Sequence, residues 1–400
     1  MRQKIQSLLS HLNHGLVERD AVLKTALLAV LAGENVVLVG PPGTGKSLLA
    51  RRIAQGLGEG SQGLRYFEYL LTKFSTPEEL FGPLSITALK NDQFHRNTDG
   101  YLPSVELAFL DEVFKASSSI LNALLTIMNE RVFHNGSAAQ HVPLRALIAA
   151  SNELPTDQEE LSALYDRFLV RCFVDYVSEE SLPLLLDTES ETPAGGLKRI
   201  TANDISELES LAQNVALPAE VMDAIIHIWQ QHKRVFKNDS QEYLSDRRLK
   251  KLVRLMQFSA ATNERHEIDF SDLLLLRNCL WNNPKNAGKA QAILDSVFHD
   301  PHIAKERDQI CAVPHLGNAQ TGRISKIYLD SHYDVFLGSP LVQIKTHEGS
   351  FDVSATYAGL SKKIHVSVGD EVSAGDSLVT IKTENKKVQL LKQVENNIWL

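Results

Sequence analysis

The sequence predicts an α/β protein: a parallel sheet covered by helices, followed by a helical domain and a small β-rich domain. From Met1 to about Asp175, helix-like segments alternate with the short apolar runs NVVLV, ELAFLDE and LRALIAASNE. This alternation is typical of a parallel sheet with helices on both faces. From about Ser178 to Asn283, apolar residues recur at helical spacing, as in AEVMDAIIHIWQQH. Strand-like alternation follows in KKIHVSVGDEV.

These changes of pattern predict four parts along the chain. We expect an αβα core over residues 1–178, a helical domain over 179–283, a linker over 284–323 and a β-rich module over 324–400. Within the core, STPEELF is typical of a helix start, with Thr76 as N-cap and Glu79 completing a capping box. The stretch RVFHNGSAAQHVPLR predicts a hairpin that turns at Asn135 and Gly136.

Composition and charge exclude several classes of protein. The 41 basic and 49 acidic residues give a net charge of -8, so binding to nucleic acid is not expected. The three cysteines, Cys172, Cys279 and Cys311, lack CxxC spacing, which argues against zinc and disulfides and favours a cytoplasmic location. The most apolar window, residues 21–40, contains Lys24 and Glu34, so no membrane span is predicted.

The strongest motif is a phosphate-binding loop between an apolar strand and a helix. Residues 40–48 are Gly40, Pro41, Pro42, Gly43, Thr44, Gly45, Lys46, Ser47 and Leu48, and the first eight match G-x-x-x-x-G-K-[ST]. Such a loop surrounds the β-phosphate with backbone N–H groups at a helix N-terminus. We expect Lys46 to reach the β- and γ-phosphates of ATP and Ser47 to bind Mg²⁺. The competing interpretation is a simple glycine turn.

Two further strand ends carry polar residues suited to hydrolysis. The run ELAFLDE delivers Asp111, a candidate Mg²⁺ ligand, followed at once by Glu112, a candidate base that polarises water. The next run, LRALIAASNE, ends in Asn152, which can position that water or sense the γ-phosphate. Alternatively, Asn152 only forms a turn before Leu154 and Pro155.

The order of these motifs resembles a known family. GPPGTGKS, FLDE, SNELP, ALYDRF and SDRR follow one another as in AAA+ ATPases of the MoxR family, and TKFSTPEELFGPLSI and LLTIMNERVFHNG resemble its RavA-like branch. The resemblance implies an AAA+ P-loop NTPase core, a helical lid domain, ATP or ADP at subunit interfaces and a homo-oligomeric ring, a hexamer. It also implies chaperone-like remodelling of a client that the sequence does not identify, often beside a partner with a von Willebrand factor A domain.

The resemblance assigns roles to two arginines. Arg167 in LYDRFLVR is the candidate arginine finger, with Arg171 as a substitute, because a guanidinium from a neighbour stabilises charge in phosphoryl transfer. Arg247 in YLSDRRLKK is the candidate lid sensor of the γ-phosphate, with Arg248 as the alternative. Exposed ion pairs or a solvated basic helix face are the competing explanations. Glu18 and Arg19, in GLVERD, fall where this family lines the adenine pocket.

The C-terminal part resembles a second family. HVSVGDEVSAGDSL is similar to half of a biotinyl/lipoyl-type barrel, but Asn385 occupies the position of the modifiable lysine and Lys386 is displaced by one. We therefore expect an unmodified recognition module.

Two other classes share the phosphate-binding loop. A small-molecule kinase would have it without needing Asp111, Glu112 and a neighbour's arginine. A DNA-translocating AAA+ relative would share the 132–145 hairpin, but that hairpin carries little positive charge. A GTPase would need an NKxD-like element, which the sequence lacks.

Overall fold

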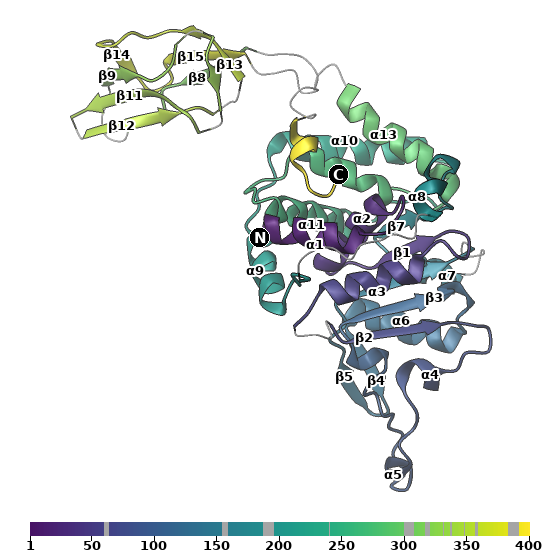
Figure 1. The fold of residues 1–400 in the computed structure, drawn as a ribbon. Helices are drawn as coiled ribbons and strands as arrows, with labels where there is room; N and C mark the ends of the chain where they lie inside the picture. Colours follow the sequence, from purple (N-terminus) through teal and green to yellow (C-terminus); the bar gives the residue numbers. More distant parts are fainter. Residues whose placement is uncertain are drawn as a thin grey trace. The chain divides into compact units, whose positions relative to one another are not determined.

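We describe the protein from a computed structural model (Figure 1). It describes residues 1–59, 64–153, 159–186, 196–239, 241–299, 308–316, 321–330, 332–336, 338–347, 349–356, 359–382 and 392–400. The chain divides into two compact units, one of residues 1–294 together with Val394–Leu400, and one of Asp295–Gln393. Among the helices of the described residues, none has both the length and the hydropathy needed to cross a membrane.

A five-stranded parallel sheet forms the centre of the first unit and confirms the predicted α/β fold. Its strands run in the order β2 (Tyr66–Leu70), β3 (Leu107–Asp111), β6 (Ala146–Ser151), β1 (Val36–Val39) and β7 (Val170–Phe173). All four neighbouring pairs are parallel. Every residue of β1 and β6 is buried, as expected of strands covered on both faces.

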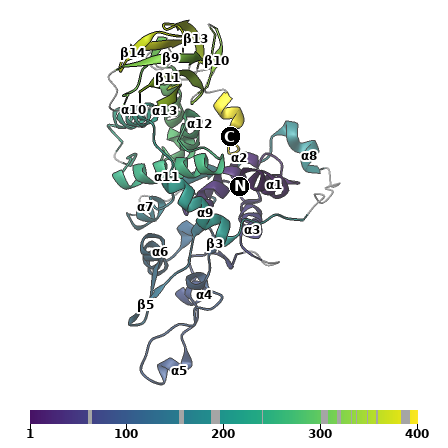
Figure 2. The ribbon, with the colours of Figure 1, turned by 90° about the vertical axis from the view of Figure 1, so that its left-hand side faces the viewer.

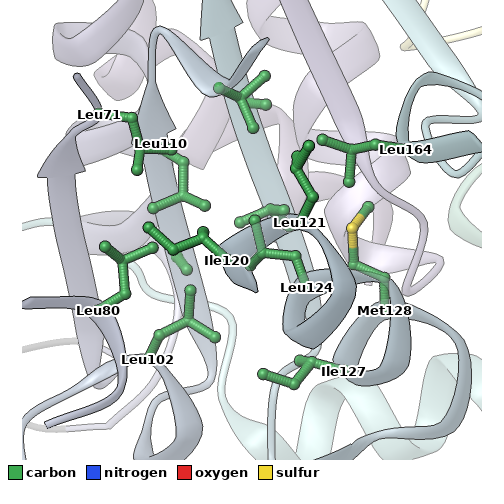
Figure 3. Packing of buried hydrophobic residues seen from close by; sticks show 14 of the residues in the cluster. Leu71, Leu80, Leu102, Leu110, Ile120, Leu121, Leu124, Ile127, Met128 and Leu164 are labelled. Carbon is green, nitrogen blue, oxygen red and sulfur yellow. The ribbon is translucent and has the colours of Figure 1, made fainter. Parts of the chain in front are cut away.

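Helices cover both faces of this sheet. On one face, α6 (Ser118–Glu130) and α7 (Glu159–Tyr165) pack on alternate strand residues such as Val37, Leu110 and Leu147. Figure 3 shows the leucine-rich side chains of this layer, which include Leu121, Leu124 and Leu164. On the other face lie α2 (Asp20–Leu31) and α3 (Lys46–Gly56), with α1 (Arg2–Asn13) packed on both. Because successive strand side chains point to opposite faces of the sheet, each strand contributes apolar residues to both layers.

An arm projects from the side of the sheet on which β2 is the outermost strand. It comprises α4 (Pro77–Phe81), α5 (Ile86–Leu89), η1 (Leu102–Ser104) and the hairpin of β4 (Val132–Asn135) and β5 (Ala138–His141). The predicted hairpin and the capping box of Thr76 and Glu79 are confirmed. Asn135 braces the arm: its Oδ1 accepts from Arg96 N at 2.6 Å and its Nδ2 donates to Arg96 O at 3.0 Å. In both views α5 lies at the far end of this arm (Figure 2).

The next segment is helical, as expected. Its elements are η3 (Glu179–Ser181), α8 (Leu182–Leu186), α9 (Ala202–Gln213), α10 (Ala219–Val235), α11 (Asp246–Thr262), α12 (Phe270–Leu273) and η4 (Leu274–Asn278). Ser245 caps α11, because its side chain accepts a hydrogen bond from Arg248 N.

Residues 284–323, expected to be a linker, contain regular elements. They are η5 (Pro284–Asn286), α13 (Ala287–His299), β8 (Asp308–Ala312) and the start of β9 (Thr321–Ile327). Pro284 begins its 3₁₀ turn, and the Asn283 side chain caps it by accepting from Lys285 N. Pro and Asn here act as helix-start residues, which explains why composition alone favours a linker.

The second unit is β-rich and contains two four-stranded antiparallel sheets. One has the order β10 (Asp334–Val335), β13 (Gly359–Ile364), β15 (Ser377–Lys382) and β8, and the other β12 (Gly349–Ser354), β11 (Pro340–Thr346), β9 and β14 (Glu371–Ser373). A buried apolar cluster that includes Leu341, Ile344 and Ile381 forms its core. Asn385 and Lys386 lie outside the described residues.

The last residues of the chain return to the first unit. Asn397 and Trp399 are 5% and 2% exposed. Asn397 Nδ2 donates to Ser271 Oγ at 2.9 Å, and Trp399 Nε1 donates to Thr262 Oγ1 at 2.7 Å. Val394–Leu400 therefore belongs to the first unit rather than to the β-rich unit, and residues 397–399 are buried there.

Candidate functional site

Three polar segments meet at the carboxyl edge of the sheet. The loop of residues 40–45 follows β1, Asp111 ends β3 and Asn152 follows β6, and these three strands are neighbours. Ligands of open α/β sheets bind in the crevice outside such strand ends. The structure thus brings together the predicted phosphate loop, acidic pair and asparagine.

The loop has the backbone that its glycines predict. Gly43 and Gly45 have φ of +78° and +86°, in the left-handed region, and nothing would meet a Cβ at either position. Gly45 is the N-cap of α3, so the first free N–H groups of that helix face the loop. At Gly40, by contrast, a Cβ would lie 2.0 Å from Val174 O. Gly40 therefore permits close packing against the chain after β7.

We predict that Gly40→Ala strongly destabilises the protein. The added Cβ would collide with a backbone carbonyl that cannot move aside as a side chain can, and overpacking of this kind costs about 1–3 kcal/mol or more. The midpoint of urea unfolding should fall. Gly288→Ala is the matched control, because a Cβ there meets nothing within 4 Å. Equal midpoints for the two variants would contradict the prediction.

Lys46 is the first residue of α3, directly after the loop, and is only 5% exposed. Its Nζ donates to Gly40 O and Pro41 O, both at 2.7 Å, and to Asn152 Oδ1 at 3.1 Å. Burial lowers the pKa of Lys46, and the nearby carboxylates of Asp111 and Glu112 oppose that shift. The ammonium is thus held among neutral oxygens, where a phosphate would be a stronger partner.

The acidic pair is held by hydrogen bonds. Asp111 Oδ1 accepts from Glu112 N at 2.9 Å, and burial raises the pKa of Asp111. Glu112 is 8% exposed and has φ of +53°. Its Oε1 accepts from Asn152 Nδ2 at 2.5 Å, and its Oε2 lies 3.3 Å from Lys115 Nζ. Two hydrogen bonds and one ion pair therefore connect Lys46 through Asn152 and Glu112 to Lys115.

This set of groups fits a nucleotide with magnesium. Ser47 offers a hydroxyl and Asp111 a carboxylate, the oxygen ligands that Mg²⁺ prefers. The loop's N–H groups and Lys46 Nζ are donors for phosphate oxygens. Lys115 was not predicted to be part of this site. Its i,i+3 spacing from Glu112, at the end of η2 (Val113–Lys115), is the sequence signal that could have indicated it.

The two predicted arginines, Arg167 and Arg247, lie at the opposite edge of the sheet. Arg167 precedes β7, and its carbonyl accepts from the Nδ2 of Asn35, the residue before β1. Arg247 Nη2 donates at 2.9 Å to Asn129 Oδ1, near the end of α6. Both line a small pocket together with Asp166, Leu169, Ser245, Arg248 and Lys251. Lys251 in turn contacts Glu34, just before β1.

The alternative arginines are buried and bonded within the fold. Arg171 is 0% exposed, donates to Trp281 O at 2.8 Å and lies 4.5 Å from the centre of the Tyr165 ring. Arg248 is 4% exposed and donates to Asn282 Oδ1 at 2.6 Å and also to Cys279 O. Arg171 joins β7 to the helical segment, and Arg248 joins α11 to the chain after η4 within that segment. Neither guanidinium can reach another molecule without breaking these bonds.

Glu18 and Arg19 contact the loop and the chain that leaves β7. Arg19 is 8% exposed, and its Nε donates to Thr44 O at 3.1 Å. Its Nη2 donates to Asp175 O at 2.5 Å. The Glu18 carboxylate accepts from Ser178 N at 3.0 Å and from Ser178 Oγ.

Comparisons with known proteins agree with this fold. A family model described as the MoxR domain in the MoxR-vWA-beta-propeller ternary systems matches residues 3–213, and a model of an AAA lid domain matches residues 220–294. The uncharacterized protein MJ0812 of Methanocaldococcus jannaschii is 44% identical over 312 residues, which cover 76% of this chain and 79% of the relative. The uncharacterized protein MJ0079 of the same organism is 44% identical over 282 residues, 70% of each chain.

A solved structure has the same fold. It is a candidate ATPase from Cytophaga hutchinsonii that superposes with a TM-score of 0.57 at 18% identity, covering 74% of this chain and 94% of that chain.

Proposed function

The chain belongs to the MoxR family of AAA+ ATPases, and from that premise we propose that it hydrolyses ATP only where a neighbouring copy of the chain completes the site. The observation that carries the proposal is the position of Arg167 and Arg247. Strand β1 separates them from the phosphate loop, and the four residues of β1 span about 13 Å. An arginine at the amino edge cannot reach a phosphate at the carboxyl edge of its own sheet.

Within one copy, the observed contacts support the following proposed roles. The N–H groups of residues 43–47 and Lys46 Nζ bind the phosphates, while Ser47 and Asp111 hold Mg²⁺. When bound, magnesium neutralises phosphate charge. Glu112 accepts a proton from water, and Asn152, which already bonds both Lys46 and Glu112, sets the position of that carboxylate.

The neighbouring copy supplies the remaining positive charge. Arg167 reaches the γ-phosphate as the finger, and Arg247, on the same pocket, contacts the same nucleotide from the helical lid. In this proposal Arg247 acts at the neighbour's site. A sensor that couples hydrolysis to rotation of its own lid would instead have to lie at its own phosphate loop. Arg171 and Arg248 have no such role in this proposal.

The assembly and its partners are proposed from the family. We propose a cytoplasmic, homo-oligomeric ring, by analogy a hexamer, that remodels a client protein in a chaperone-like way. The matching family model is described from systems that also contain a vWA protein, which supports a von Willebrand factor A domain partner. A β-rich unit after the lid is in keeping with the RavA-like branch, and we propose that it recognises a partner without carrying a cofactor.

Two alternatives fit the site less well. In a monomeric small-molecule kinase, Arg167 and Arg247, which line the same pocket away from their own phosphate loop, would have no role in catalysis. A DNA translocase would present cationic side chains on the hairpin, but residues 132–141 contain no Lys or Arg.

Dilution tests the proposal. ATP turnover per subunit should fall as the protein is diluted, because a separated subunit lacks the neighbour's arginines. The measurement is phosphate release over a thousandfold range of protein concentration, with the oligomeric state followed by analytical ultracentrifugation. Full turnover by a monodisperse monomer would contradict the proposal and favour the kinase.

A further inference from the structure

Arg19 connects three segments that are far apart in the sequence. Besides its bonds to Thr44 O and Asp175 O, Nη1 donates to Glu18 O at 2.9 Å. The acceptors lie in the phosphate loop, in the chain that leaves β7 and in the turn before α2. A buried guanidinium with three such bonds has a fixed position.

The bond to Thr44 O controls the direction of a loop N–H group. A trans peptide is planar, so the C=O of one residue and the N–H of the next point in opposite directions. Because Arg19 Nε holds Thr44 O on one side of the loop, it turns Gly45 N–H to the other. Gly45 has φ of +86°, and no atom would meet a Cβ there, so this backbone has room to rotate when nothing holds it.

We propose that Arg19 is a positioning residue for nucleotide binding: it aims Gly45 N–H at the phosphates and ties the loop to the start of the lid. The proposal rests on the proposed function, because it assumes that the loop binds a nucleoside triphosphate. It differs from a role in the adenine pocket, since the ligand group that Arg19 serves is the phosphate chain.

The link to the lid runs through the residue next to Arg19. Glu18 has φ of +56°, and its carboxylate accepts the N–H and hydroxyl of Ser178, the N-cap of η3. The Ser178 side chain, with smaller contributions from Ser181 and Ser178 N, lowers the pKa of Glu18 to about 2, so it remains ionised at neutral pH. A shift of Thr44 on phosphate binding would thus be passed to Asp175 and Ser178, where the helical segment begins.

Arg52 offers a matched control. Its Nη1 also donates to two backbone carbonyls, those of Leu12 and His14, and neither acceptor lies in the loop or after β7. Arg52→Met therefore removes comparable bonds without affecting the phosphate loop.

The test measures the affinity of Arg19→Met for ATP and for inorganic tripolyphosphate, with Arg52→Met beside it. We expect Arg19→Met to weaken both ligands about tenfold, the effect of one misaligned phosphate donor, with turnover at saturating ATP little changed. Arg52→Met should bind both like the wild type. Arg19→Lys keeps the charge, but its donors all lie on one nitrogen rather than along a planar fork, so it should show a smaller loss; it also guards against misfolding of the methionine variant.

Hydrogen exchange tests the link to the lid. At saturating ATP, the amides of residues 176–181 should change their exchange rate in the wild type and change much less in Arg19→Met.

Several outcomes would overturn the proposal. Loss of ATP affinity with unchanged tripolyphosphate affinity would place Arg19 at the base or ribose. Equal losses in Arg19→Met and Arg52→Met would reduce its role to general stability. Unchanged affinity in Arg19→Met, while Lys46→Ala loses ATP, would reject this proposal and leave the proposed function standing. Failure of the wild type to bind ATP would reject both.

Discussion

Arg167→Ala is expected to lower ATP turnover about a thousandfold or more while leaving ATP affinity nearly unchanged. A finger supplied in trans contributes about 10³–10⁵ to phosphoryl transfer, because it neutralises charge that develops only in the transition state. Arg167 lies at the amino edge of the sheet, so its removal leaves the contacts of Lys46 and Asp111 intact. Phosphate release and equilibrium ATP binding measure the two effects. Arg65→Ala, an exposed arginine paired with Glu106, is the control and should change neither.

Mixing distinguishes a shared site from a site within one subunit. Glu112→Gln should bind ATP but hydrolyse it about 10²–10⁴ times more slowly, because it lacks a proton acceptor. Mixed with Arg167→Ala, it supplies an intact arginine to the other variant's intact loop, so activity should exceed the sum of the separate proteins. Absence of rescue at every mixing ratio, with mixed oligomers demonstrated, would place Arg167 outside the site.

Lys46→Ala is expected to weaken ATP binding at least a hundredfold. Its ammonium would donate to two phosphate oxygens, and hydrogen bonds to charged groups contribute about 1.5–3 kcal/mol each. The folded protein should not lose stability, because Lys46 is a desolvated cation whose present partners are neutral oxygens.

Calorimetric titration with ATP and thermal unfolding measure these two quantities. Lys73→Ala, at an exposed position in the segment after β2, should behave like the wild type in both. Near-normal ATP affinity in Lys46→Ala would remove the phosphate assignment of the loop.

The sequence predicts the carboxyl edge of the sheet well. Asp111 is the last residue of an apolar strand, Lys46 and Asn152 come after the ends of two others, and parallel strands carry their carboxyl ends to one side. Their proximity therefore follows from local pattern together with parallel topology. The bonds of Asn152 to both Lys46 and Glu112 require only that β6 lie between β3 and β1.

The choice between neighbouring arginines could not be predicted in the same way. Arg167 and Arg171 differ by four residues, and what separates them is that β7 begins at Val170 and that Trp281 places its carbonyl beside Arg171. A contact across 110 residues leaves no local signal. Arg19 is similar, because its role depends on where the backbone carbonyls of Thr44 and Asp175 come together.

The return of Val394–Leu400 to the first unit affects how the β-rich unit can be studied by truncation. A chain cut at residue 294 would lack Asn397 and Trp399 and leave the polar groups of Ser271 and Thr262 without these partners inside the helical segment. Such a truncation would confuse the loss of a recognition module with damage to the ATPase. An internal deletion that joins residue 294 to Val394 through a flexible linker keeps Val394–Leu400 in the first unit. It therefore isolates the contribution of the β-rich unit.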